Sequence, residues 1–165
     1  MTFTASIRQP PLRYLLLAAP LIFIAHFMEE APGFVTWFNQ HVDRGISMQL
    51  FWSVNYTGLG ITIAVAILEW VSRSALSAGL AIAWLSFLML ANALLHIVAT
   101  IVDGAYMPGL VTALLLYLPF YCWVVIRAVR ERRVPRSAMV AAALLAAMPM
   151  LAHGYLIIFR RSRLF

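Results

Sequence analysis

The chain has 165 residues, of which 64% are hydrophobic and 11% are charged, and its mean hydropathy is +0.90. These values lie outside the range of soluble globular domains and indicate an integral membrane protein. The net charge of +6 comes from twelve arginines set against six acidic residues. Because the arginines stand mostly between hydrophobic segments, we expect them to face anionic lipid head groups, and we expect no nucleic-acid partner.

Five hydrophobic segments are predicted to span the bilayer, since a helix needs about 20 apolar residues to cross it. They cover residues 14–28, 50–70, 75–101, 110–129 and 137–159. The predicted fold is therefore an all-α integral membrane protein, with a single five-helix transmembrane domain over residues 1–165. The first segment follows arginines, as the core of a signal peptide does. It lacks a small-x-small cleavage site, so we expect a retained helix.

A short amphipathic helix is predicted at about residues 33–42, between the first two spans. The stretch GFVTWFNQHV places its apolar and aromatic residues on one side at helical spacing. Such a helix lies in the membrane interface, where Trp37 is either a simple aromatic anchor or part of a lid over a site.

The distribution of arginines predicts the orientation of the helices. Eight arginines fall at the N-terminus and in the second and fourth loops, against four on the opposite side. Because basic loops stay in the cytoplasm, we expect a multi-pass protein of the cell inner membrane with a cytoplasmic N-terminus. The C-terminal stretch FRRSRLF acts against this orientation.

The polar residues within the spans gather at one depth, toward the non-cytoplasmic face. They are His26, Glu29, Glu30, Asn55, Asn92, His96 and His153. At about 1.5 Å per residue, they fall within a slab roughly 10 Å deep. The spacing of His26, Glu29 and Glu30 places all three on one face of the first span. Because ionisable groups in membrane helices face the bundle interior and pair there, we expect the first, third and fifth helices to meet around them.

Each of these residues also has a purely structural explanation. His26 and Glu30 could form only an intrahelical pair, and Asn55 and Asn92 could only join helices by hydrogen bonds. His153 could be a satisfied buried histidine. Three histidines and two carboxylates at one depth nevertheless favour a functional site.

The stretch DGAYMPGL at 103–110 lies on the same side. Pro108 and Gly109 suit a tight turn that opens the fourth helix, whose N-terminal amides then point toward the site. Tyr106 is either a phenol donor into the site or an interfacial anchor.

The motifs HFMEE, NALLH with His96, and YMPG together resemble the HXXEE domain family, over residues from about 26 to 119. This resemblance implies a small membrane protein and a suspected enzyme of unestablished reaction. His153 lies outside the family pattern. The spacing of His26 and Glu30 is also similar to the His-x-x-x-Glu pair of the emopamil-binding sterol isomerases, which are five-helix membrane proteins that transfer protons.

The first chemical hypothesis is a site for one divalent metal ion, with zinc preferred over manganese or iron. His26, Glu30, His96 and His153 would be the ligands, and Glu29 would orient a ligand or act as a general base. The predicted reaction is hydrolysis or isomerisation of a lipid-like substrate. The residues expected to act in catalysis are His26, Glu29, Glu30 and Tyr106, and those expected to bind substrate are Asn55, Asn92, Trp37, Pro108 and Gly109.

Three alternatives remain open. A metal-free acid–base pair could isomerise or cyclise a prenyl-like or sterol-like substrate, with tryptophans shielding a carbocation. The same ligands could pass a metal ion or proton through a transporter, although the cytoplasmic halves of the last three spans offer few polar groups. The chain could also be a structural subunit. Small residues such as Gly58 and Gly60 could support a homodimer.

Overall fold

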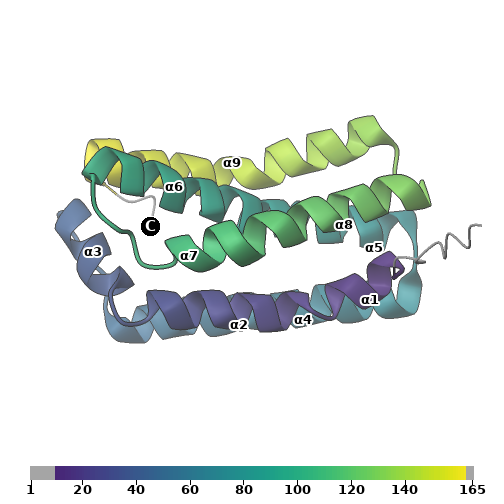
Figure 1. Cartoon of the computed structure of the whole chain (residues 1–165), viewed down its shortest axis with the longest axis horizontal. Helices are drawn as coiled ribbons and strands as arrows, with labels where there is room; N and C mark the ends of the chain where they lie inside the picture. Colours follow the sequence, from purple (N-terminus) through teal and green to yellow (C-terminus); the bar gives the residue numbers. More distant parts are fainter. Residues whose placement is uncertain (1–9, 163–165) are drawn as a thin grey trace, which may run out of the picture.

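The computed structural model describes residues 10–162, and within this range the chain is helical with no strand. Its helices run side by side along the long axis of the molecule (Figure 1). Among the described residues, five segments are long and apolar enough to cross a membrane: Leu12–Glu30, Met48–Ser72, Ala75–Asp103, Leu110–Glu131 and Arg136–Arg160. Their ends lie within two residues of the predicted ends, and the prediction of an all-helical chain with five such helices is confirmed.

The first segment consists of two helices, α1 (Leu12–Leu16) and α2 (Ala19–Glu30). Pro20 stands in the first turn of α2 and has no N–H to donate to the carbonyl of Leu16, so the helix breaks just before it. The first backbone N–H of α1, that of Leu12, donates a hydrogen bond to a distant residue in the sequence, Glu131, whose Oε1 lies at 2.8 Å. The start of the first span is thereby tied to the end of the fourth.

The predicted short helix is α3 (Phe34–His41), and it closes one end of the bundle. Trp37 and Phe38 are buried there, in a cluster that includes Leu95 and Ile157. Trp37 Nε1 donates to Asp103 Oδ2 at 2.9 Å. The helix α3 is therefore fastened to the end of the third span, and it leads into α4 (Met48–Ser72), which Ser47 caps by accepting from Leu50 N at 3.1 Å.

The third and fourth spans each contain one π-helical turn. The third span runs through α5 (Ala75–Leu85), η1 (Ser86–Ala91) and α6 (Asn92–Asp103), and the fourth runs through α7 (Leu110–Thr112), η2 (Ala113–Tyr117) and α8 (Leu118–Glu131). The two π turns pack against each other. Such turns interrupt the α-helical register and occur often at functional sites.

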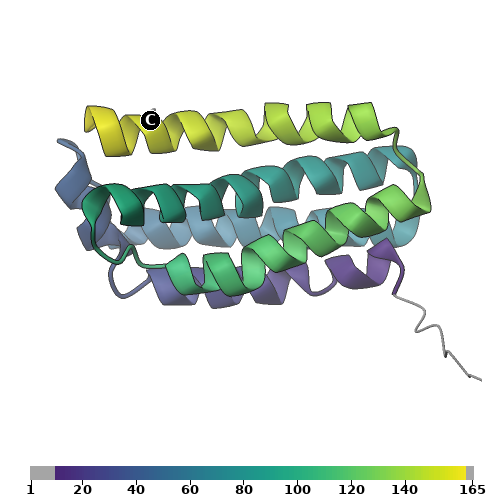
Figure 2. The ribbon, with the colours of Figure 1, turned by 45° about the horizontal axis from the view of Figure 1, so that its top comes forward.

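The fifth span is α9 (Arg136–Arg160), which packs against α5, η1 and α6. The α6–α7 turn and α3 lie at one end of the bundle, and the α4–α5 and α8–α9 connections lie at the other (Figure 2). At this second end Glu69 is fully buried and paired with Arg133, and Ser77 Oγ donates to it at 2.6 Å. The two ends of the molecule therefore carry separate groups of charged residues.

Candidate functional site

Three ligand-type side chains meet below the α6–α7 turn. His26 and Glu30 come from α2 and His96 comes from α6, and their exposed fractions are 1%, 5% and 0%. One ligand atom of each lies within 4.8 Å of the others. Glu30 Oε1 is central, at 3.1 Å from His96 Nε2 and 3.4 Å from His26 Nε2. We call these three residues the His–Glu cluster.

Helix geometry explains the cluster. His26 and Glu30 are one turn apart on α2, so they share a face. That face meets α6, where the rings of His26 and His96 contact each other edge-on with centroids 5.0 Å apart. On its other side the His26 ring lies against the Tyr117 ring of η2, at 4.1 Å between centroids. The hydroxyl of Tyr117 is buried and has no hydrogen-bond partner among the described residues.

Thr112 favours one tautomer of His26. Its hydroxyl donates to the carbonyl of Gly109 at 3.3 Å, so it accepts from His26 Nδ1–H, at 2.8 Å. A neutral imidazole protonated at Nδ1 carries its lone pair on Nε2. That Nε2 is buried without a hydrogen-bond partner in the described part of the chain, and it faces Glu30. In this tautomer Nε2 is unprotonated, which is the form of an imidazole nitrogen that can bind a metal.

Gly109 lies directly against the cluster. Its φ of 102° is in the left-handed region, which favours glycine. A β-carbon at this position would lie 2.5 Å from His96 Cε1, 2.9 Å from Glu30 Cγ and 3.1 Å from His26 Cε1. The neighbouring Pro108 packs on Gly33, where a β-carbon would lie 2.8 Å from Pro108 Cγ. The turn can cover the cluster this closely only because glycine has no side chain.

Glu29 faces a different neighbour from Glu30. Its carboxylate accepts from the backbone N–H of Val111 at 3.0 Å and of Thr112 at 2.7 Å, and it also accepts from the hydroxyl of Tyr106. A carboxylate is favourable at these amides because they carry partial positive charge at the start of the fourth span. Burial and the adjacent Glu29 carboxylate raise the pKa of the Tyr106 phenol, so it stays protonated and donating at neutral pH. Glu29 thus fastens the fourth span to the first.

This arrangement differs from the predicted single face for all three side chains of the first span. Successive residues on a helix are about 100° apart, so Glu29 and Glu30 point to different neighbours. The fourth span, which the sequence did not place at these side chains, contacts His26 through Thr112 and Tyr117. Sequence reasoning missed these two residues. The signal available in the sequence is that both residues follow closely after the Tyr-x-Pro-Gly turn. The π turn over 113–117 changes the helical spacing, so an α-helical pattern does not predict which way Tyr117 points.

The other predicted site residues lie outside the cluster. His153 is on α9, where its ring stacks with Phe38 at 6.3 Å between centroids, and it is not among the three converging side chains. Asn55 donates to the carbonyl of Phe51 in its own helix at 3.0 Å. Asn92 lies one turn before His96, and its buried side-chain oxygen has no hydrogen-bond partner within residues 10–162. Trp37 is engaged with Asp103.

Comparison with known proteins identifies the family. A family model described as "Protein of unknown function with HXXEE motif" matches residues 17–124. The chain belongs to this HXXEE family. The resemblance inferred from its motifs is confirmed. No curated protein and no solved structure matches the chain.

The part of the chain that matches the HXXEE family contains the whole cluster. It begins in the first span and ends within α8, so it includes all three cluster residues, the turn with Gly109, and Thr112. His153 and the whole of the fifth span lie beyond it. The boundary of the match therefore agrees with the spans from which the cluster is built.

Proposed function

We propose that this HXXEE protein is a membrane-embedded metalloenzyme, which binds one zinc ion at His26, Glu30 and His96 and hydrolyses or isomerises a lipid-like substrate. The convergence of the three buried ligand atoms within 4.8 Å is the observation that carries the proposal. Two histidines and one glutamate form one of the ligand sets of catalytic zinc sites, in which the fourth position is left for water or substrate.

Two of the three distances between the ligand atoms are close to those around such an ion. Two ligands at about 2.0–2.2 Å from a tetrahedral zinc ion lie roughly 3.3 Å apart. Glu30 Oε1 lies 3.4 Å from His26 Nε2 and 3.1 Å from His96 Nε2. The hydrogen bond of His26 Nδ1 to Thr112 provides the outer partner that ligating histidines commonly have.

Each residue around the ion has a part in the proposed chemistry. A bound zinc ion would supply a Lewis acid and lower the pKa of a coordinated water. The ion would be bound by His26, Glu30 and His96. The turn at Gly109 and the buried surroundings of the cluster exclude bulk water. The Tyr117 hydroxyl, buried beside the His26 ring, is available to donate a hydrogen bond to substrate. A lipid-like substrate fits best because apolar helices surround the cluster.

The proposed setting is the cell inner membrane. Five apolar helices of spanning length support insertion, and the arginine distribution supports a cytoplasmic N-terminus with the cluster toward the non-cytoplasmic face. Substrate would then enter from the membrane or from the non-cytoplasmic side.

A second candidate is a metal-free acid–base enzyme. The observation in its favour is the hydrogen bond between His96 Nε2 and Glu30 Oε1, at 3.1 Å, which needs no ion. A histidine and a carboxylate paired in a dry site can move a proton on an apolar substrate. The presence or absence of bound metal separates the two candidates.

The metal content of the purified protein tests the proposal. We expect elemental mass spectrometry, after purification in detergent without chelators and reloading with zinc, to find about one zinc ion per chain. His26→Ala, Glu30→Gln and His96→Ala should each lose the ion while eluting as folded protein on gel filtration. His153→Ala is the matched control, and it should keep the ion because its ring lies against Phe38 outside the cluster.

Two results would contradict the metal site. The first is wild-type protein without zinc after reloading, which would leave the acid–base candidate. The second is zinc retained in all three cluster variants, which would place the ion elsewhere in the chain. Loss of zinc in His153→Ala as well would restore the four-ligand set predicted from the sequence.

The hydroxyl of Thr112 should tune zinc affinity. Thr112→Val keeps the shape of the side chain but removes the acceptor for His26 Nδ1–H, at 2.8 Å, which favours the tautomer with its lone pair on Nε2. Loss of such an outer partner weakens metal binding by about 10–100-fold. The measurement is competition for zinc against a chelating dye. Thr112→Ser, which keeps the hydroxyl, should bind nearly as tightly as wild type, and equal affinities of the two variants would remove Thr112 from this role.

A further inference from the structure

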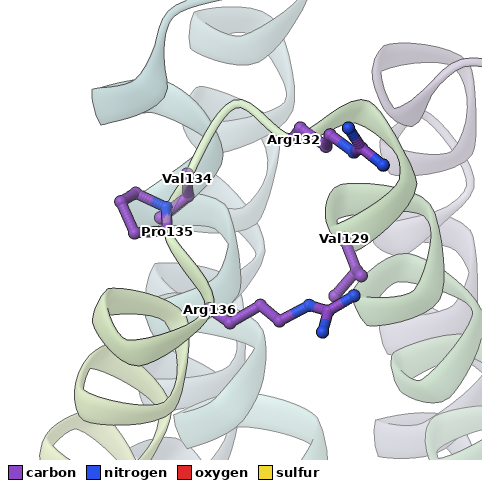
Figure 3. Close-up of a pocket in the computed structure, with 5 residues that line it drawn as sticks. All are labelled: Val129, Arg132, Val134, Pro135 and Arg136. Carbon is purple, nitrogen blue, oxygen red and sulfur yellow. The ribbon is translucent and has the colours of Figure 1, made fainter.

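The connection between α8 and α9 contains a second candidate binding site, at the end of the bundle opposite the α6–α7 turn. A pocket of about 340 Å³ opens there, and its lining consists of Val129, Arg132, Val134, Pro135 and Arg136 (Figure 3). The guanidinium groups of Arg132 and Arg136 both extend toward the α8 side of this pocket. We call it the arginine pocket.

The positive charge of the arginine pocket is not neutralised by the protein. Within residues 10–162, neither Arg132 nor Arg136 has an ion-pair partner. The acids of this end are already engaged elsewhere. Glu69 is held by Arg133 and Ser77. Glu131 accepts from Arg127 at 3.2 Å and from the backbone of Leu12 at 2.8 Å, and it lies 3.2 Å from Arg133.

The backbone adds to this charge. Arg136 is the first residue of α9, and its N-cap, Pro135, forms no side-chain capping bond. The first turn contains no acidic residue. Free amides at a helix N-terminus carry partial positive charge, so cations are unfavourable there and anions are stabilised. Arg136 is thus unfavourable for α9 unless an anion lies beside it, whereas Arg132, the C-cap of α8, stands where a cation is favourable.

We propose that the arginine pocket binds a phosphate-bearing ligand, and that this ligand is the phosphodiester head group of an anionic phospholipid. The planar guanidinium fork matches phosphate oxygens in bidentate geometry. Val129, Val134 and Pro135 give the pocket an apolar wall suited to the glycerol and first methylenes of a lipid. The pocket is at a helix-connecting loop on the arginine-rich side, where a spanning bundle meets head groups. This site is independent of the His–Glu cluster.

Lipid titration of the whole protein in detergent micelles tests the proposal. The readout is thermal unfolding, as phosphatidylglycerol or phosphatidylcholine is added. We expect phosphatidylglycerol to stabilise wild type well beyond phosphatidylcholine. In the double variant Arg132→Gln/Arg136→Gln, the amount needed for half of that stabilisation should rise about 30-fold, given the typical contribution of two basic residues near an anionic head group.

The matched control is Arg160→Gln, which removes one arginine from the opposite end of the same helix and should respond as wild type does. The variant Arg132→Lys/Arg136→Lys keeps the charge without the planar fork, and it should bind phosphatidylglycerol with intermediate strength. If the glutamine double variant fails to fold, the response of this lysine double variant to phosphatidylglycerol tests the proposal in its place.

The outcomes are distinct. If inorganic phosphate protects wild type, and phosphatidylglycerol does no more than phosphatidylcholine, the ligand is a soluble phosphate compound and the lipid assignment is overturned. If neither phosphate nor phosphatidylglycerol has an effect beyond phosphatidylcholine, the pocket is not an anion site. If Arg160→Gln weakens the response as much as the double variant, general charge and not the pocket attracts the lipid.

Discussion

Gly109→Ala is expected to destabilise the protein by about 2–5 kcal/mol, since a non-glycine residue is strained at positive φ and overpacking a core adds a similar cost. The new β-carbon would lie 2.5 Å from His96 Cε1 and 2.9 Å from Glu30 Cγ, where real contacts do not occur. The turn or these two side chains must therefore move. We expect a lower midpoint of thermal unfolding in detergent, and loss of bound zinc from the protein that remains folded.

Gly104→Ala is the control for this substitution. Gly104 also has a positive φ, of 62°, but nothing lies within 4 Å of an added β-carbon. It should show only the backbone cost of about 1–2 kcal/mol, with zinc binding intact. Equal effects of the two substitutions would mean that backbone conformation, and not the contact with the cluster, makes Gly109 important.

Arg133→Met is expected to destabilise the protein by about 3–5 kcal/mol, the range measured when one partner of a buried ion pair is removed. Glu69 is fully buried, and without Arg133 its carboxylate keeps only the hydrogen bond from Ser77, at 2.6 Å. An uncompensated charge in an apolar bundle is costly because neither water nor a cation solvates it. Unfolding in detergent, followed by circular dichroism, measures the loss.

Two variants separate this explanation from a general loss of surface charge. Arg127→Met removes a partner of Glu131 one turn away on α8, in an i,i+4 pair whose side chains are 20% and 21% exposed. Such a helix pair contributes about 0.3–0.5 kcal/mol. Glu69→Gln, combined with Arg133→Met, removes the stranded charge while keeping a group that can accept from Ser77. The double variant should therefore recover much of the stability lost in Arg133→Met. A double variant less stable than Arg133→Met alone would show that Arg133 acts through packing.

Much of the fold follows from the sequence alone. Five apolar runs between arginine-containing loops are enough to predict five helices, because backbone amides in an apolar medium must bond within their own segment. The spacing of His26 and Glu30 also determines that both side chains leave the same face of one helix. The Tyr-x-Pro-Gly stretch predicts a turn at Gly109, and the structure has a left-handed residue there.

The tertiary structure alone decided which helices meet at the cluster. In an apolar bundle many helix faces are equally hydrophobic, so the sequence does not show that the fourth span lies against the cluster, or that the ring of His153 stacks with Phe38. The hydrogen bond of Thr112 to His26 exists because the turn brings the start of the fourth span over α2. Glu29 and Glu30 are adjacent in sequence, but a rotation of about 100° per residue directs one to the fourth span and the other to His96. Sequence spacing fixes the face of a single helix, whereas the identity of the partner across that face depends on how all the helices pack.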